Sequence, residues 1–264
     1  MKKRIDLRLV EEGMCASREQ AQRTLMAGAV WVNGKRIEKV SQLVEEEALI
    51  TLTNTTDQYV SRGGYKLEKA IAEFGLNITG RICLDAGAST GGFTDCLLQA
   101  GAAHVYAIDV GYGQLAWKIR QDKRVTVWER QNIRYFSKDL LERLPSLITA
   151  DLSFISLKLV LEKFRELIEP DGELVTLIKP QFEAGREKVG KKGVVRDQTV
   201  HLEVLSRLAE NAPQKGWHLV DLTYSPIRGP EGNIEYLGHW QVNSTRIPVI
   251  DEVVKNAWHD LCQV

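Results

Sequence analysis

Two lysines and two carboxylates stand in four segments of the sequence whose neighbouring residues are strongly apolar. Lys66 follows Ser-Arg-Gly-Gly-Tyr, Asp151 begins Asp-Leu-Ser-Phe, Lys179 begins Lys-Pro-Gln-Phe-Glu, and Glu235 lies in Gly-Asn-Ile-Glu-Tyr. A single charged residue at such a position is usually the solvated end of a strand or helix. Four of them together can bind and orient a hydroxyl group and accept its proton, provided that the fold brings them to one place.

A glycine-rich turn follows an apolar stretch within residues 82–93, Ile-Cys-Leu-Asp-Ala-Gly-Ala-Ser-Thr-Gly-Gly-Phe. Glycines there let the backbone approach a nucleotide-like ligand closely, and Asp109, 24 residues after Asp85, is placed to bind ribose hydroxyls. The spacing differs from the Gly-x-Gly-x-x-Gly of NAD-binding proteins, and no Walker lysine follows. An acid beside the turn suits cationic S-adenosylmethionine better than a pyrophosphate; glycines used only for turn geometry, with Asp85 as a cap, are the alternative. The candidate cofactor-binding residues are Asp85, Gly87, Ala88, Ser89, Gly91, Gly92, Phe93, Asp109 and Asp151.

The chain must fold so that these residues meet, and from residue 80 onwards it alternates between strand-like and helix-like stretches. The expected strands are 82–86, 104–110, 125–129, 147–151, 174–179, 217–224 and 234–240. Helical stretches between the first five predict a mostly parallel, doubly wound sheet, and the last two strands, joined without a helix, predict an antiparallel edge hairpin. The carboxyl ends of parallel strands share one edge, so Asp151 and Lys179 should lie beside the glycine-rich turn.

The first 58 residues predict a small separate module. Ile5, Leu9 and Val10 have helical spacing, and Ser17 with Gln20 resembles a capping box that opens a second helix. Asn33-Gly34 is a strong hairpin signal after a short strand. We therefore expect a helix–helix–hairpin module over 1–58, a linker at 59–62, a catalytic domain over 63–245 and a C-terminal helix within 246–264.

Composition limits the function classes. Of 264 residues, 44% are hydrophobic and 27% are charged, which excludes a disordered chain. The 35 cations balance the 35 acids, yet the charges lie in blocks: 1–40, 114–134 and 179–196 each carry four excess cations. The balance therefore does not argue against RNA. Four cysteines and five histidines without ligand spacing predict no disulfide framework and no metal site, and the absence of a long apolar run predicts a cytoplasmic protein without membrane spans.

The order of the motifs resembles the TlyA family of ribosomal RNA 2′-O-methyltransferases, also labelled haemolysins. Residues 1–58, with Arg4, Asp6, Ser17, Arg18 and Asn33-Gly34, are similar to an S4 RNA-binding domain. The resemblance implies a Rossmann-like class I methyltransferase domain of the FtsJ type: an α/β fold with a seven-stranded, mostly parallel sheet and an antiparallel edge hairpin, preceded by a small α+β S4 domain. It also implies S-adenosylmethionine as methyl donor, S-adenosylhomocysteine as product, and no metal.

The family's four catalytic residues fall on Lys66, Asp151, Lys179 and Glu235, with Lys179 accepting the proton or orienting the hydroxyl. Asn132 stands where an acid commonly faces the adenine in the wider FtsJ class, and we expect its amide to serve instead. The expected RNA contacts are Arg4, Arg18, Arg23, Lys35, Arg62, Lys188, Lys191 and Lys192.

The resemblance favours a cytidine ribose within a ribosomal subunit as target, without DNA or membrane partners, and we expect a monomer. The weighed alternatives are an NAD-dependent oxidoreductase, a non-catalytic ribosome-assembly factor and a pore-forming haemolysin. The glycine spacing disfavours an NAD-dependent oxidoreductase. The presence of all four predicted catalytic residues disfavours a non-catalytic assembly factor. The third would need membrane-active segments, which the sequence does not show.

Overall fold

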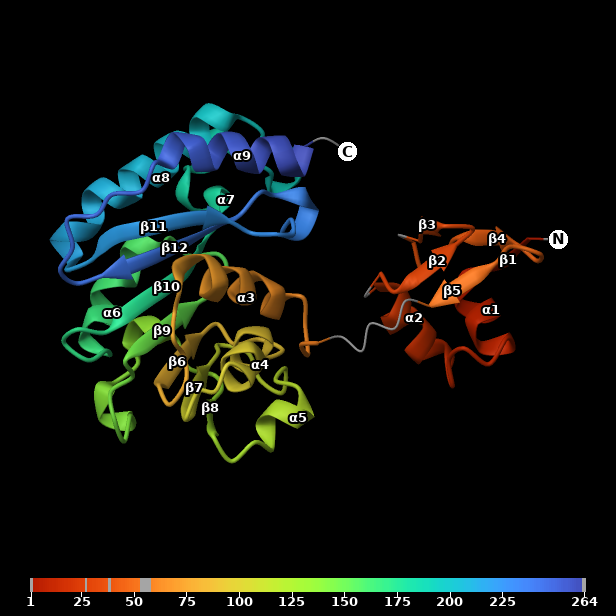
Figure 1. The fold of residues 1–264 in the computed structure, drawn as a ribbon, viewed down its shortest axis with the longest axis horizontal. Helices are drawn as coiled ribbons and strands as arrows, with labels where there is room; N and C mark the ends of the chain where they lie inside the picture. Colours follow the sequence, from red (N-terminus) through yellow and green to blue (C-terminus); the bar gives the residue numbers. More distant parts are fainter. Residues whose placement is uncertain (1, 27, 38, 53–57, 263–264) are drawn as a thin grey trace. The chain divides into compact units, whose positions relative to one another are not determined.

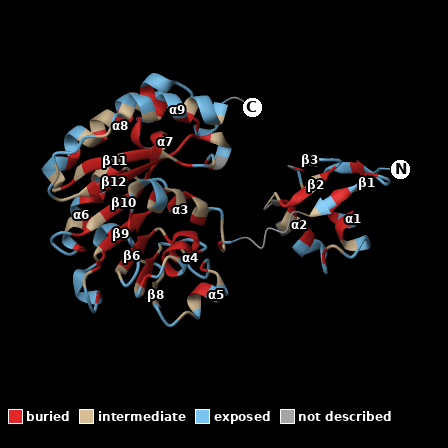
Figure 2. Ribbon diagram, viewed as in Figure 1, coloured by how far each residue is buried: buried red, intermediate tan, exposed pale blue. Residues whose placement is uncertain are grey.

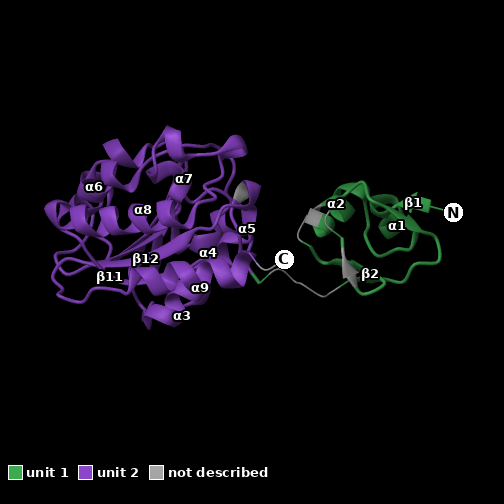
Figure 3. Ribbon diagram, turned by 90° about the horizontal axis from the view of Figure 1, so that it is seen from above, with its two compact units in different colours: residues 1–58 green, residues 59–264 purple. Residues whose placement is uncertain are grey.

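The computed structural model describes residues 2–262, except residues 27, 38 and 53–57. It divides into two compact units, Met1–Gln58 and Tyr59–Val264 (Figure 3). Each unit has its own hydrophobic core, so each is described by itself.

The small unit packs two helices against short strands. Its elements are β1 (Lys2–Arg4), α1 (Ile5–Glu11), α2 (Arg18–Met26), β2 (Val30–Val32), β3 (Lys35–Arg36), β4 (Leu43–Glu45) and β5 (Ile50–Leu52). Strands β3, β2 and β5 form an antiparallel sheet, and β1 pairs with β4. Asn33 and Gly34 both have positive φ (49° and 75°), as a type I′ hairpin turn requires. The expected helices and hairpin are present. Strands β1, β4 and β5 were missed because three residues are too few to show a period.

The large unit is built on a seven-stranded sheet of order β11-β12-β10-β9-β6-β7-β8 (Figure 1). The strands are β6 (Ile82–Ala86), β7 (His104–Ile108), β8 (Val125–Trp128), β9 (Leu147–Ala150), β10 (Glu173–Ile178), β11 (His218–Tyr224) and β12 (Tyr236–Gln241). The first five are parallel, and β12 runs antiparallel to both β10 and β11. The predicted seven-stranded, mostly parallel sheet with an antiparallel edge hairpin is confirmed.

Helices cover both faces of this sheet. They are α3 (Gly63–Phe74), α4 (Gly92–Gln99), α5 (Trp117–Arg120), α6 (Leu161–Glu166), α7 (Pro180–Glu183), α8 (Gln198–Asn211) and α9 (Ile250–Cys262). One hydrophobic cluster joins the sheet to α6, α8 and α9, and the other joins it to α3, α4 and α5. Because both faces are covered, the strands other than the edge strand β8 are buried along most of their length (Figure 2), which explains their continuous apolar runs.

The division between the two units falls between residues 58 and 59. Residues 59–62, interpreted from the sequence as a linker, are part of the large unit. Tyr59 is only 4% exposed and its ring packs edge-on against Tyr65, with 5.3 Å between centroids. The backbone N–H of Val60 donates to Asp95 Oδ2 at 2.9 Å. The buried ring of Tyr59 therefore fixes this segment to the large unit.

Candidate active site

The glycine-rich turn joins β6 to α4, and its shape depends on close backbone approaches. Gly87 has φ of +84°, and a Cβ atom there would lie 2.5 Å from the backbone oxygen of Asp151. A Cβ on Gly92 would lie 2.3 Å from Ser61 Oγ. Contacts this short exclude side chains, so the glycines allow the turn to lie directly against the ends of β9 and α3.

A cavity of about 680 Å³ opens beside this turn at the carboxyl edge of the sheet. Asp109, just after β7, lines it, and its two oxygens accept backbone N–H bonds from Ser89 (2.8 Å) and Gly111 (2.6 Å). Asn132 also lines it, with Oδ1 accepting from the Arg134 N–H at 3.1 Å. Each carboxylate oxygen of Asp109 retains a further lone pair for ligand hydroxyls. These bonds hold the Asp109 carboxylate and the Asn132 amide in place in the wall of the cavity.

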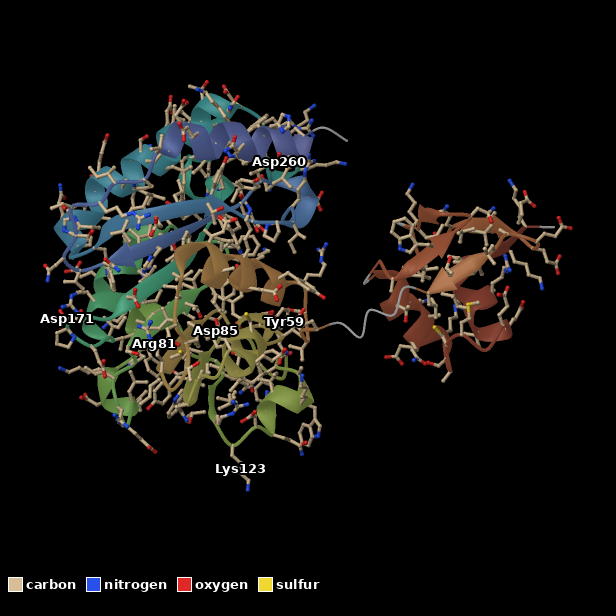
Figure 4. All side chains as sticks on the ribbon, in the orientation of Figure 1. Tyr59, Arg81, Asp85, Lys123, Asp171 and Asp260 are labelled. Carbon is tan, nitrogen blue, oxygen red and sulfur yellow. The ribbon has the colours of Figure 1, made fainter. Side chains whose placement is uncertain are left out.

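Asp85, expected to bind the cofactor, lies beneath the turn and does not line this cavity. Its side chain is fully buried in the interior of the large unit (Figure 4). Its oxygens accept bonds from the hydroxyls of Thr94 (2.6 Å) and Thr149 (3.4 Å), and so join β6 to α4 and β9. Burial raises the pKa of Asp85 to about 7. Strand side chains alternate between the two faces of a sheet, and that of Asp85 points under α4 instead of into the cavity.

A second cavity of about 380 Å³ contains all four predicted catalytic residues. Lys66 comes from the first turn of α3, Asp151 and Lys179 from just beyond β9 and β10, and Glu235 from just before β12. The two lysines pair with different carboxylates: Lys66 Nζ lies 2.6 Å from Glu235 Oε2, and Lys179 Nζ lies 2.7 Å from Asp151 Oδ1. The sequence predicted the four residues together but not this division into two pairs.

The two ion pairs differ in burial. Glu235 is fully buried and Lys66 is 8% exposed, so each depends on the other for charge compensation. Glu235 lies directly under Gly229, where a Cβ would come within 2.2 Å of its Oε1. Asp151 is partly exposed and lines both cavities. The first pair is therefore held in the interior, while the second meets the open space where a substrate can enter.

The two cavities adjoin one another, because Gly87, Ser89, Asp151 and Ser153 line both. Ala88, Gly92 and Phe93, expected at the cofactor, line only the smaller one. Gly91, also expected at the cofactor, lines neither of these two cavities. It packs instead against Leu115, whose Cδ1 would lie 2.9 Å from a Cβ at this position. The turn thus separates a nucleoside-sized space from a space lined by charged groups.

The two cavities are also lined by residues that the sequence reasoning did not assign to the site, among them Ser153, Phe154 and Arg228. Ser153 Oγ accepts a hydrogen bond from Lys179 Nζ at 2.9 Å. Phe154 is 92% exposed, has a φ of +62° and packs beside Phe182 with ring centroids 5.2 Å apart. Both residues follow Asp151 in Asp-Leu-Ser-Phe, so their adjacency to it was the available signal. Arg228 lines the smaller cavity from the loop between β11 and β12, and no sequence signal marked it.

The predicted RNA-binding residues fall into distinct environments. Arg62 is exposed and lines the smaller cavity. Lys188 pairs with Glu203, and Lys191 and Lys192 are exposed in the loop before α8. The side chains of Arg23 and Lys35 lie outside the described residues.

In the small unit, Arg4 and Arg18 converge on one buried carboxylate. Arg4 Nε and Nη2 both lie 2.9 Å from the oxygens of Asp6, and Arg18 Nε lies 3.0 Å from Asp6 Oδ2. Asp6 is fully buried, and the hydrogen bonds from Arg4 hold the pKa of its carboxyl far below the ordinary range. Both guanidinium groups remain partly exposed, with 38% and 53% of their side-chain surfaces accessible. Asp6 therefore fixes two arginines side by side at the surface.

Among the described residues, no group of histidine, cysteine and acidic side chains is arranged to hold a metal ion. The same residues contain no helix that is both long and apolar enough to cross a bilayer.

Comparison with known proteins agrees with this architecture. Residues 59–241 match the FtsJ-like methyltransferase family, and residues 3–50 match the S4 domain. The chain is 45% identical over 234 residues to the 16S/23S rRNA (cytidine-2′-O)-methyltransferase TlyA of Mycobacterium tuberculosis, covering 88% of this chain and 87% of that protein. It is 44% identical over 239 residues to Hemolysin A of Brachyspira hyodysenteriae, covering 90% and 99%. The solved structure of a hemolysin candidate from Streptococcus thermophilus is 43% identical, with a TM-score of 0.78 over 99% of this chain and 97% of that one.

The fold, the S4 domain and these relatives agree with one another, and the chain belongs to the TlyA group of FtsJ-like methyltransferases.

Proposed function

We propose that this protein transfers a methyl group from S-adenosylmethionine to the 2′-oxygen of a cytidine ribose in ribosomal RNA, within a ribosomal subunit. The observation that carries the proposal is that Lys66, Asp151, Lys179 and Glu235, from four separate segments, line one cavity that adjoins a nucleoside-sized cavity. The relatives from Mycobacterium tuberculosis and Campylobacter jejuni are both named rRNA (cytidine-2′-O)-methyltransferases. A protein with this fold and site fits the same reaction.

The larger cavity fits the proposed methyl donor. Asp109, held by two backbone N–H groups, is the proposed acceptor for the ribose hydroxyls, and the amide of Asn132, which lines the same cavity, is the proposed partner of the adenine. The carboxylates of Asp109 and Asp151 favour a ligand with a cationic amino group and sulfonium. When bound, S-adenosylmethionine supplies a methyl group that is already activated for displacement, and S-adenosylhomocysteine remains as the product.

The protein's own task is then to align the ribose hydroxyl and take its proton. Lys179 Nζ is the candidate for this task because it lines the smaller cavity and contacts Asp151 and Ser153, which line both cavities. Lys66 adds a fixed positive charge to the same cavity, compensated by Glu235. Phe154, exposed at the rim of the larger cavity, offers a flat surface on which a nucleobase can stack.

The proposed RNA contacts lie in two regions. In the S4 domain, Arg4 and Arg18 present guanidinium groups prepositioned by Asp6 for phosphate oxygens, and Arg23 and Lys35 complete the proposed contact set. In the catalytic domain, Arg62, Lys188, Lys191 and Lys192 are the proposed contacts. The proposal places the protein in the cytoplasm, as a monomer acting on ribosomal subunits and not on DNA.

The decisive experiment maps 2′-O-methylation on naked rRNA and on intact small and large subunits incubated with the protein and S-adenosylmethionine. Lys179→Ala should lose turnover by at least about 100-fold, the scale of general-base catalysis, while retaining S-adenosylhomocysteine affinity. Lys179→Arg keeps the charge but has no proton-accepting form, so it should be equally inactive. Substantial methylation by either variant would remove Lys179 from the mechanism, and absence of methylation by the wild-type protein on every substrate would refute the proposed function.

Two other functions are distinguished by simple measurements. A non-catalytic assembly factor would bind subunits as tightly with Lys179→Ala and show no methyl transfer in the wild type. An NAD-dependent enzyme would gain thermal stability from NAD instead of S-adenosylhomocysteine. The haemolysin names of the relatives from Brachyspira hyodysenteriae and Streptococcus thermophilus suggest a third function, which is tested by erythrocyte lysis; the proposed function predicts no lysis.

A further inference from the structure

Ser153 is a polar residue of the site that none of the motif reasoning used. Its side chain lines both cavities, and its Oγ accepts a hydrogen bond from Lys179 Nζ at 2.9 Å. On the same nitrogen, Asp151 Oδ1 lies 2.7 Å away. Lys179 Nζ therefore has two oxygen partners that come from one short segment of chain, Asp151 to Ser153.

We propose that Ser153 is a positioning residue for methyl transfer: with Asp151 it directs the lone pair of the Lys179 amine toward the ribose 2′-hydroxyl. This inference rests on the proposed function. A neutral lysine amine carries two hydrogens and one lone pair. Ser153 accepts one of these hydrogens, and the Asp151 carboxylate, 2.7 Å from the nitrogen as an ion-pair partner, attracts the other, which leaves the lone pair facing the open cavity. Without Ser153, the amine keeps a single fixed acceptor and turns freely about its Cε–Nζ bond.

The proton balance of the step is simple. The 2′-oxygen forms a bond to the methyl carbon, and the electron pair of the broken carbon–sulfur bond stays on sulfur. The proton of the 2′-hydroxyl passes to the Lys179 lone pair, which makes an ammonium group. That ammonium then gives a proton to water in the open cavity, and the neutral amine is restored for the next turnover.

The segment that carries Ser153 is anchored to the segment that carries Lys179. Glu183, four residues after Lys179 and 8% exposed, accepts bonds from Ser156 Oγ (2.6 Å) and the Leu157 N–H (2.7 Å). Helix α7 runs from Pro180 to Glu183, so Lys179 and Glu183 belong to one rigid turn. Ser153 and Lys179 are thus held in register across the site by a second, independent contact between the same two segments.

Several charged groups face Lys179 and contribute to any pH dependence. Asp151 contacts Lys179 directly. The same cavity is lined by Lys66 on α3, Arg62 just before α3, Glu235 just before β12, and Arg228 in the loop between β11 and β12. Asp85 lies behind Asp151 and interacts with it electrostatically. A substitution of Ser153 changes none of these charges. Its effect on a pH–rate profile therefore reports the hydrogen bond to Lys179 alone.

The test compares Ser153→Ala with wild type in single-turnover methylation of the subunit that the wild type modifies, between pH 6 and 10. Removing the hydroxyl should lower the plateau rate about 10-fold, within the range that misplacement of a catalytic group produces. The rising limb of the pH–rate profile should move to lower pH in Ser153→Ala. The Ser153 hydroxyl accepts a hydrogen bond from Lys179 and so favours its ammonium form, and this support is lost in the variant. KM for both substrates and S-adenosylhomocysteine affinity should stay within about twofold, since the hydroxyl acts on the transfer step.

Two further comparisons guard against an effect on folding. Ser153→Thr keeps a hydroxyl and should restore the rate, whereas the equally shaped Ser153→Val should match the alanine variant. Ser137→Ala is the control, because Ser137 caps a short 3₁₀ turn (Lys138–Leu140) away from both cavities, and its rate should equal that of the wild type.

An unchanged plateau and limb in Ser153→Ala, or equal rates for the threonine and valine variants, would overturn the inference. Those results leave wild-type methylation intact, so they are distinct from failure of the proposed function, in which the wild type itself transfers no methyl group.

Discussion

The buried carboxyl of Asp85 gives a prediction about stability that can be worked out from the structure. Burial raises the pKa of Asp85 to about 7, against about 3.9 for an aspartate in an unfolded chain. Between these two values the folded protein binds a proton that the unfolded chain does not. Stability therefore falls as pH rises through this window, and the loss is complete above pH 7. Asp85→Asn has no proton to lose and should remove this dependence.

The magnitude follows from the size of the shift. A difference of about three pKa units corresponds to about 4 kcal/mol, which is an upper bound because the interior relaxes around a charge. About two of these three pKa units lie between pH 5 and pH 8, so Asp85→Asn should gain at most about 3 kcal/mol in free energy of unfolding, relative to wild type, on going from pH 5 to pH 8. Any pH-independent cost of the amide, such as poorer bonds to Thr94 and Thr149, cancels in this difference.

The measurement is urea unfolding of both proteins at pH 5 and pH 8, followed by circular dichroism. Asp122→Asn is the control, because hydrogen bonds from Arg124 lower the pKa of Asp122, whereas burial raises that of Asp85. This variant should gain no free energy of unfolding, relative to wild type, between pH 5 and pH 8. Equal pH dependence in wild type and Asp85→Asn would refute the reasoning, since Asp85 would then be charged in the fold without consequence for stability.

Three further outcomes are expected. Gly87→Ala should reduce S-adenosylhomocysteine affinity at least 10-fold by calorimetry, because its Cβ would lie 2.5 Å from the Asp151 oxygen; Gly113→Ala, also at positive φ but with nothing within 4 Å, should bind normally. Asp6→Asn should weaken rRNA binding several-fold in filter assays and flatten its salt dependence, because the arginines lose their anchor; an unchanged salt slope would contradict this. Glu173→Gln should lose stability at pH 7 and show a smaller further loss as pH falls from 5 towards 2. The His239 bond and Arg81 lower the Glu173 pKa to about 2, so its contribution is present above about pH 4.3 and is lost on acidification.

Much of the fold was predictable because its signals are local. Apolar runs with flanking turns located all seven strands of the large sheet within two residues at each end, and Asn33-Gly34 located the hairpin. A polar residue directly after a parallel strand lies at the carboxyl edge of the sheet, which is the local signal for Asp151 and Lys179. In each case the information lies within a few neighbouring residues. Lys66, in the first turn of α3, and Glu235, just before β12, were assigned through the family resemblance.

Other features depend on which distant segments meet, and the tertiary structure alone decided them. Lys66 and Glu235 are 169 positions apart, and no local pattern says that this lysine takes this carboxylate while Lys179 takes Asp151. Asp85 has the residue type of a ligand-binding acid, but the sheet points it under α4, where burial changes its protonation. A sequence specifies side-chain types and local backbone preference; an ion pair or a pKa depends on distances of a few ångström between segments, and packing sets those distances.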